Sequence, residues 1–459
     1  MIGIVTFDFE ERFKTFMNNE KPIAIIGAGI AGLTAADFLN SKNIPFILFE
    51  AGKKIAGLAS SFKDENGFSY DFGAHFITNR LADAIGIGAE CYTVKYYGET
   101  VWLGGKTYKY PFGLIYIPRM TFSGIKSKLT FLGNRHESKS AAEWFRKSYG
   151  NALANEVALP LIEAWSGASA EDLSAAVGES LPGSIGKTLY LKLASKLTGR
   201  AVACGYNREM PEKADVYHVY PKKGVSVLCE KLATGLENKI KLETPVEAIL
   251  VEGGKVKAVR VKGETQEVSA VISTAPAHIL SKIVEGTDAL QSFSKFRYRP
   301  MTFINMRFEG RHLLPDTVMW FPETQFPFFR LTEAPISMPW LAPEGKTIIT
   351  VDIGCEMGDE FWKMDEETIS ELCLKNLTQI IPDVRKRYLG CNVLRTPIAY
   401  PVFLNEYEAE RQKFMQSTNI ENLLSVGRNG EFSHIFMEDV YWRTRKKTQQ
   451  YLDKLGSNG

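Results

Sequence analysis

The sequence predicts an α/β protein built from two interleaved domains, one organised on a parallel sheet and one of α+β character. A strand, a glycine-rich turn, a helix and a second strand follow one another between residues 23 and 50, which is the order of a parallel βαβ unit. After a stretch of different character at residues 96–219, a helix and short strands return at residues 220–285. Because the first pattern resumes after an insertion, we expect the two domains to interrupt each other in sequence.

The turn of the first unit carries the glycine spacing of a dinucleotide-binding site. The β-branched run Ile23–Ile26 leads into Gly27-Ala28-Gly29-Ile30-Ala31-Gly32. Gly27 permits a tight turn, Gly29 lets backbone N–H groups approach a pyrophosphate, and Gly32 lets the helix pack closely on the sheet. The helix N-terminus would then face the phosphates with the positive end of its dipole. The unit is therefore predicted to be Rossmann-like.

Glu50 completes this fingerprint at the end of the second apolar run, residues 46–49. An acidic side chain at this position can accept hydrogen bonds from both hydroxyls of a ribose. Its charge would repel a 2′-phosphate, so Glu50 favours an adenine dinucleotide without one. Ala51 begins the loop that follows, which contains Gly57.

The composition is that of an ordinary globular protein with a large core. The chain has 459 residues, 45% of them hydrophobic, and its 55 basic and 53 acidic residues give a formal net charge of +2. A net charge this close to zero does not indicate a nucleic-acid partner. The six cysteines form no CxxC pair and the six histidines have no metal-ligand spacing, so we expect reduced thiols and no metal site. No apolar run reaches roughly 18 residues and the N-terminus has no leader pattern, which predicts a cytoplasmic protein without a transmembrane helix.

The remaining segments complete the two domains. Aromatic residues recur at helical spacing within residues 1–20, which predicts an amphipathic helix docked on the body. A helix at residues 225–237 precedes short strands within residues 239–273, which we interpret as a β-meander. Residues 298–352 are rich in strand formers and predict an antiparallel sheet, followed by a helix at residues 365–382.

We divide the chain at these changes of pattern. The third strand of the meander is predicted at residues 267–273, and a C-terminal helix is predicted from about Met437. The nucleotide-binding domain is expected to be discontinuous, with the second domain filling the gaps. The predicted ranges are 1–95, 220–285 and 395–459 for the first domain, and 96–219 and 286–394 for the second.

Three blocks of the sequence, taken in register, resemble one known superfamily. The first is the glycine turn with Glu50 and the Gly57-Leu58-Ala59-Ser60 loop. The second is Asp71-Phe72-Gly73-Ala74-His75-Phe76, and the third is Gly427-Arg428-Asn429-Gly430 with Met437-Glu438-Asp439. They are similar to the flavin-dependent superfamily that includes flavin amine oxidases, protoporphyrinogen oxidase, phytoene desaturases and UDP-galactopyranose mutase. The resemblance implies FAD and a Rossmann-like FAD-binding domain interleaved with an α+β substrate-binding domain. It is much less specific for the reaction.

The resemblance also implies which residues contact the cofactor. The backbone at Val246 would meet the adenine, and Thr274 would lie near the flavin at the end of a strand. Ala56 stands where the superfamily has its first loop glycine, and Leu58 stands where it has Arg or Asn, so backbone groups of this loop are the expected contacts. The expected cofactor-binding residues are Gly27, Ala28, Gly29, Ile30, Ala31, Gly32, Glu50, Ala51, Gly57, Leu58, Ala59, Gly73, Ala74, His75, Phe76, Val246, Thr274, Gly427, Arg428 and Met437.

Four positions are candidates for the chemistry. His75 lies in a glycine-flanked turn that the resemblance places against the isoalloxazine, with a structural role as the alternative. Arg428 would pair with the flavin or pyrophosphate edge, unless it forms a surface salt bridge. Arg330 would suit an anionic group of the substrate, or form a structural ion pair. The helix start near Met437 could stabilise a reduced flavin through its dipole. His75 and Arg330 are the catalytic candidates.

Two reactions fit the resemblance. The leading hypothesis is an FAD-dependent oxidoreductase, an oxidase or dehydrogenase similar to protoporphyrinogen oxidase and the amine oxidases, in which a small organic substrate gives a hydride equivalent to flavin N5. The alternative is an isomerase similar to UDP-galactopyranose mutase, acting on a nucleotide sugar. A noncatalytic binding module, as in GDP-dissociation inhibitors, is a third possibility. Residues 427–440 contain no Cys or Tyr, so we expect noncovalent FAD.

A basic amphipathic segment at residues 186–200 is left over by these assignments. We interpret it as a solvated helix face, with contact to a membrane surface or to an anionic substrate as the alternatives.

Overall fold

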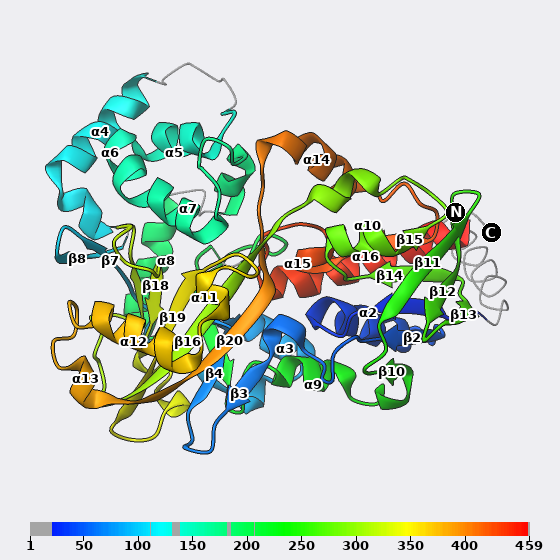
Figure 1. Ribbon diagram of the computed structural model, residues 1–459, viewed down its shortest axis with the longest axis horizontal. Helices are drawn as coiled ribbons and strands as arrows, with labels where there is room; N and C mark the ends of the chain where they lie inside the picture. The colour runs from blue at the N-terminus through cyan, green and yellow to red at the C-terminus, as the bar shows by residue number, and fades with distance from the viewer. Residues whose placement is uncertain (1–20, 111, 131–137, 181–184, 206, 458–459) are drawn as a thin grey trace.

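The computed structural model describes residues 21–457 with gaps at 111, 131–137, 181–184 and 206. One half of the molecule is built on five parallel strands in the order β10-β2-β1-β14-β21 (Figure 1). These strands come from segments far apart in the sequence, which confirms a Rossmann-like core interleaved with other structure. Their bounds are Ile23–Ile26 (β1), Phe46–Phe49 (β2), Ile240–Lys241 (β10), Ala270–Ser273 (β14) and Leu423–Ser425 (β21). The helix predicted within residues 1–20 lies outside the described residues.

The central strand β1 is buried on both faces. Ile23 and Ile25 belong to one cluster of buried apolar side chains, whereas Ala24 and Ile26 belong to another on the opposite side of the sheet. A strand covered on both faces needs an apolar residue at every position, which is why the sequence reads here as a continuous apolar run.

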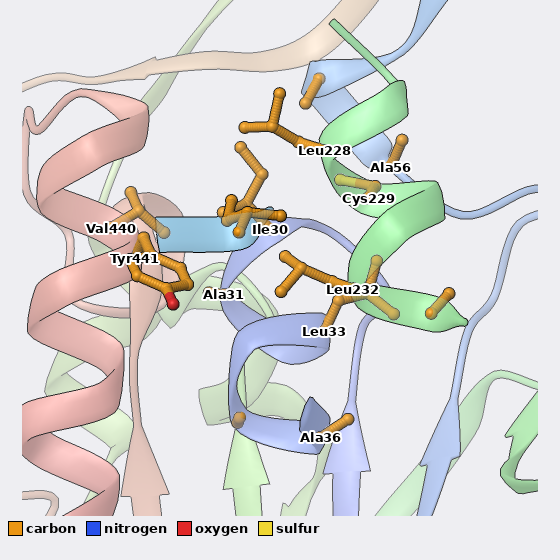
Figure 2. Close-up of a cluster of buried hydrophobic side chains, with 14 of the residues drawn as sticks. Ile30, Ala31, Leu33, Ala36, Ala56, Leu228, Cys229, Leu232, Val440 and Tyr441 are labelled. Atoms are coloured by element: carbon orange, nitrogen blue, oxygen red, sulfur yellow. The ribbon is translucent and has the colours of Figure 1, made fainter. Parts of the chain in front are cut away.

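Helix α2 (Ile30–Ser41) follows the glycine turn and packs between two other helices. Figure 2 shows Leu228 and Leu232 of α9 (Val227–Ala233) on one side of α2, and Val440 and Tyr441 of α16 (Met437–Ser457) on the other. These contacts fix the position of the α2 N-terminus relative to the sheet.

The prediction of residues 267–273 as the third strand of the meander is wrong. The polar strand β13 (Glu264–Glu267) ends the meander and pairs with β12 (Lys255–Val261), which pairs in turn with β11 (Val246–Glu252). The apolar run after it forms β14 and enters the parallel sheet instead. A segment that is buried at every position suits the interior of that sheet and not a solvent-facing meander.

Two predicted helices are shorter in the structure. The helix predicted at residues 225–237 is α9, which ends at Ala233 before Gly235, a glycine with φ +78° that does not continue a helix. The helix predicted at residues 365–382 is α12 (Glu366–Leu377), and the carboxylate of Asp365 caps its N-terminus by accepting a hydrogen bond from the Thr368 N–H.

The other half of the molecule is organised on a seven-stranded sheet in the order β20-β16-β19-β18-β17-β7-β8. The sheet predicted at residues 298–352 is thus present, and two strands from residues 96–219 extend it through a parallel pairing between β17 and β7. The bounds are Glu99–Leu103 (β7), Lys106–Lys109 (β8), Tyr298–Glu309 (β16), Val318–Trp320 (β17), Arg330–Thr332 (β18), Lys346–Gly354 (β19) and Tyr388–Pro401 (β20).

Strand β20 crosses the boundary that we predicted between residues 394 and 395, and it belongs to the seven-stranded sheet along its length. We therefore propose that the second domain extends to the end of β20. Helices α4 (Pro118–Thr130), α5 (Ala141–Tyr149), α7 (Leu159–Ser166) and α8 (Ile185–Thr198) lie beside this sheet, in the left half of Figure 1. In the part of the chain that the structure describes, no helix has the length and apolarity needed to cross a membrane.

Candidate functional site

The glycine turn leaves no room for side chains at two of its positions. Gly27 has φ +96°, and a Cβ atom there would lie 2.3 Å from the hydroxyl oxygen of Thr274. A Cβ on Gly32 would lie 1.8 Å from the carbonyl oxygen of Gly27. Gly29 precedes α2 and supplies no side-chain cap, so the amides of the first helical turn are available to an external anion.

Glu50 lies across the end of this turn. One carboxylate oxygen accepts a hydrogen bond from the Ala28 N–H at 2.7 Å, and the other accepts one from the Gly52 N–H at 2.7 Å. A carboxylate has about four lone-pair sites, so two remain for donors such as ribose hydroxyls. Val246, at the start of β11, lies just beyond Thr244, whose N–H donates to the carbonyl of Glu50.

The loop with the unusual Ala56 packs directly on the glycine turn. The Ala56 N–H donates to the carbonyl of Ala28 at 2.9 Å, and Ala56 and Gly29 form a parallel bridge. Ala56 has φ +87°, a backbone conformation that favours glycine. The residue that departs from the superfamily pattern therefore keeps the glycine-like backbone. Of the neighbouring candidates, Ala59 is buried, Leu58 is half-buried, and Ala51 and Gly57 are exposed.

The turn after β4 (Ser69–Asp71) is held by a buried carboxylate. Asp71 accepts hydrogen bonds from the Ser61 hydroxyl at 2.6 Å and the Tyr220 hydroxyl at 2.8 Å. Burial and the negative charge of Asp71 raise the pKa of Tyr220 well above its ordinary value, so the phenol remains a donor. The Nδ1 atom of His75 lies 3.6 Å from the same carboxylate. Asp71 thus orients the turn that carries His75.

Gly73 brings this turn against the second domain. It has φ +84°, and a Cβ atom there would lie 3.1 Å from the Arg330 guanidinium and 3.2 Å from the Phe303 ring. Ala74 follows it and is half-buried, whereas the Phe76 ring is buried against Tyr97, with 5.0 Å between ring centroids. His75 and Arg330, the two catalytic candidates, therefore converge from different domains.

Arg330 makes an ion pair with Asp352, which faces it across the β18–β19 pairing. The Asp352 side chain is fully buried, and the guanidinium also lies over the Trp320 ring at 5.5 Å. Burial alone would lower the pKa of Arg330, but the neighbouring Asp352 carboxylate raises it above its ordinary value, so Arg330 stays charged. The structural ion pair considered for Arg330 is present, and it lies beside the His75 turn.

Arg428 is a half-buried cation of the first domain whose Nε and Nη2 atoms are buried. It lies in α15 (Gly427–Gly430), and its guanidinium sits 4.8 Å from the centre of the Tyr400 ring. Its Nε and Nη2 atoms are buried without a hydrogen-bond acceptor among the described residues, and no salt bridge of Arg428 occurs there. The surface salt bridge considered for Arg428 is therefore not formed with any residue that the structure describes. Burial lowers the pKa of Arg428, with Tyr400 opposing the shift. An anionic or electron-rich group next to these N–H donors would satisfy them.

His434 is a site residue that the sequence reasoning missed. Its ring lies 5.0 Å from Trp165 and 5.7 Å from Tyr400, between centroids. Burial, followed by the positive charges of Arg428 and Arg208, lowers the pKa of His434 well below its ordinary value, so the imidazole is neutral. Nothing in its sequence neighbourhood distinguishes it, because its partners come from α7 and β20.

The helix α16 starts at Met437 beside the His75 turn. The buried Glu438 accepts hydrogen bonds from the Thr78 hydroxyl at 2.8 Å and from Arg80. These bonds tie the first turn of α16 to the segment that follows His75. The site thus collects residues from the glycine turn, the His75 turn, β18, β20 and the start of α16. In the described part of the chain, no cluster of His, Cys, Asp and Glu could hold a metal ion.

Comparison with known proteins places this chain in a family. The model of the family "Flavin containing amine oxidoreductase" matches residues 30–429. The chain is 23% identical over 397 residues to coproporphyrinogen III oxidase of Staphylococcus aureus, covering 77% of this chain and 81% of that protein.

Solved structures show the same fold. Reduced UDP-galactopyranose mutase is similar with a TM-score of 0.77 and 19% identity, covering 95% of this chain and 96% of that one. Cyclohexylamine oxidase from Brevibacterium oxydans is similar with a TM-score of 0.70 and 14% identity, covering 95% and 99%. The superfamily resemblance seen in the sequence is confirmed, because the family match runs through both domains. The chain belongs to the flavin containing amine oxidoreductase family.

Proposed function

We propose that this protein is an FAD-dependent oxidoreductase that takes a hydride equivalent from a small organic substrate carrying an anionic group. The observation that carries the proposal is Arg428, whose buried Nε and Nη2 donors have no acceptor among the described residues. Tyr400 contacts the guanidinium, but these two donors are left for a bound group to satisfy, and an unsatisfied buried donor costs about 1–3 kcal/mol or more.

The residues present fit FAD. The first-turn amides of α2, next to Gly27 and Gly32, would hold the pyrophosphate, and Glu50 would hold the ribose. Arg428 would lie along the flavin edge, where its charge favours the anionic reduced form. When bound, the flavin supplies the hydride acceptor of the reaction.

The chain's own residues would bind and orient the substrate. Arg330 is pre-positioned by Asp352 and keeps its charge, so it can donate hydrogen bonds to a carboxylate or phosphate of the substrate. The Trp320 ring lies over this guanidinium, and the Phe303 ring lies on the same side of Gly73, so both rings would limit access of water. The positive charges of Arg330 and Arg428 also disfavour a cationic amine as substrate, because like charges repel each other.

We also propose that the FAD is noncovalent. A thioether link to a flavin needs a reactive thiolate. Burial raises the pKa of every cysteine of this chain, to about 11 for Cys91 and about 12 for Cys229. In addition, residues 427–440 contain no Cys or Tyr.

The test is the visible spectrum of the purified protein through anaerobic photoreduction, followed by admission of air. A flavin spectrum that bleaches and then recovers rapidly supports an oxidase, and slow recovery supports a dehydrogenase. Absence of flavin would overturn the proposal. Acid precipitation distinguishes covalent from noncovalent flavin. A noncovalent flavin stays in the supernatant, so a yellow pellet would contradict noncovalent binding.

A flavin-dependent isomerase acting on a nucleotide sugar is the second candidate. It is favoured by the TM-score of 0.77 to UDP-galactopyranose mutase and by the two arginines, which would suit a diphosphate. The photoreduced protein should then bind nucleotide sugars and convert them without net oxidation. If it neither binds nor converts any of them, the isomerase is excluded. Tight retention of FAD would argue against a noncatalytic binding module.

A further inference from the structure

Helix α8 presents a row of large apolar side chains to solvent. Leu189, Leu193 and Leu197 are 50%, 56% and 78% exposed. They recur at every fourth position, so they share one side of the helix. The other side packs inward through Leu191 and Ala194, in a small buried cluster with Val202. This side of α8 is exposed, as we expected of a solvated helix face, but it carries apolar side chains where such a face usually carries polar ones.

A second set of exposed apolar side chains lies on the 3₁₀ segment Phe112–Tyr116 (η3) and on α4. Tyr116 is 87% exposed and Phe122 is 71% exposed. Single exposed apolar residues are normal, but sets of this kind mark interaction surfaces in monomeric proteins. We call the two sets together the apolar face, and its members, all at least half exposed, are Ile115, Tyr116, Phe122, Ile125, Leu129, Leu189, Tyr190, Leu193 and Leu197.

Helix α8 contacts the chain just before η3, where the second set of exposed apolar side chains begins. The ammonium group of Lys192 in α8 donates to the carbonyl of Tyr110 at 3.3 Å, and Tyr110 lies just before η3. Both helices belong to the same half of the molecule, away from the parallel sheet (Figure 1). The apolar face is thus a surface of the second domain and is separate from the glycine turn.

The charges on these helices are all of one sign. Neither α4 nor α8 contains an acidic residue, although the whole chain has a net charge of only +2. Arg119 and Lys187 pair with glutamates of other segments. Lys126, Lys128 and Lys196 are exposed among the apolar side chains, and so is Lys192, which also donates to the Tyr110 carbonyl.

The combination of exposed apolar side chains and positive charge favours one kind of binding partner for the apolar face. A second copy of the chain docking through the same face would bring lysines against lysines, because a two-fold interface is self-complementary. A nucleic acid would match the charge but would leave the leucines in water. Anionic lipid satisfies both features, since apolar side chains enter the headgroup boundary while lysines bind the phosphates. We propose that the apolar face docks the protein on an anionic membrane surface. No segment needs to cross the bilayer, and the docking does not depend on the proposed reaction.

The test is co-sedimentation of the flavin-loaded protein with vesicles of phosphatidylcholine alone or mixed with phosphatidylglycerol. We expect binding to the mixed vesicles that weakens with salt. The double variant Leu193→Glu/Leu197→Glu is expected to lose binding by at least about tenfold, because two apolar side chains leave the headgroup region and add negative charge. The triple variant Lys126→Gln/Lys128→Gln/Lys196→Gln should lose the preference for phosphatidylglycerol. The matched control is Met357→Glu, at a residue that is 66% exposed outside the apolar face, and it should bind as the wild type does.

Retention of flavin and an unchanged circular dichroism spectrum would show that the variants are folded. Failure of the wild-type protein to bind the mixed vesicles would overturn the proposal. So would equal binding by the leucine double variant. A wild-type dimer in light scattering that the same variant converts to a monomer, together with no vesicle binding, would show that a second copy covers the face.

Discussion

Arg330 and Asp352 stand directly opposite each other on β18 and β19 and form an ion pair in which the carboxylate is fully buried. The pair fixes the guanidinium beside Gly73, within reach of the His75 turn. Each group is the counter-charge of the other. Removal of one partner alone would therefore leave the other charge unpaired in the protein interior.

We expect Asp352→Asn to lower the free energy of unfolding by about 3 kcal/mol, since Arg330 then loses its counter-charge. Urea denaturation of the single variants and of Arg330→Met/Asp352→Asn would measure this. The double variant should be less destabilised than the sum of the two single variants, by roughly 1–3 kcal/mol. Strict additivity would show that the ion pair contributes nothing.

Arg428→Met should change flavin affinity and stability of the apoprotein in opposite directions. Removing two buried donors without an acceptor should stabilise the apoprotein, whereas loss of a charge-assisted hydrogen bond should weaken FAD binding by about 10–100-fold. Thermal unfolding of the apoprotein and fluorescence titration with FAD are the measurements. Arg428→Lys should restore part of the affinity. A merely structural arginine would instead give a less stable apoprotein and unchanged affinity.

Gly32→Ala should abolish FAD retention, because the added methyl would meet the Gly27 carbonyl oxygen at 1.8 Å and push α2 away from the turn. The control is Gly235→Ala, where φ is +78° and no atom lies within 4 Å of the new Cβ. Both variants strain or crowd the backbone, but only the first does so at the glycine turn. Absorbance of bound flavin per polypeptide compares them, and equal retention would remove the glycine turn from the proposed site.

Ala56→Gly should raise the free energy of unfolding by about 1 kcal/mol, since Ala56 has φ +87° and an L side chain in the left-handed region costs roughly 1–2 kcal/mol. The same change at the buried Ala59, which has no positive φ, should destabilise the protein. Thermal or urea unfolding of the two variants would show whether each substitution raises or lowers the free energy of unfolding. Destabilisation by Ala56→Gly would contradict this account of the loop.

Acid should destabilise the protein through His218, which is buried and whose pKa burial lowers to about 4. Between that value and its unfolded pKa of about 6.5, the unfolded state binds the extra proton, so stability falls as the pH falls through this window. Relative to about pH 8, the contribution at about pH 5 is a loss of about 2 kcal/mol. The unfolding free energies of wild type and His218→Phe should be measured at both pH values. The change with pH in the difference between the two proteins gives the contribution of His218. A difference that does not change with pH would refute the assignment.

The sequence by itself determined the nucleotide-binding unit. Gly27, Gly32 and Glu50 are local signals, because positive φ, close approach of backbone and an acid at a strand end are dictated within a few dozen residues. The interleaving of the domains followed from the return of a helix and short strands after residues 96–219, whereas the order of the parallel strands did not follow from the sequence. Where the prediction was wrong, at residues 267–273, a run of strand formers concealed a change of sheet.

Only the tertiary structure decided what surrounds the arginines. The partner of Arg330 is 22 residues away on the next strand, and the residues around Arg428 and His434 come from α7 and β20. Spacing in sequence carries no information on such contacts, because they depend on how two domains pack. The same holds for α8: its periodicity predicted an amphipathic helix, but only the packed fold decided that its leucines at positions 189, 193 and 197 face solvent. A helix has two sides, and burial depends on which one the rest of the chain covers.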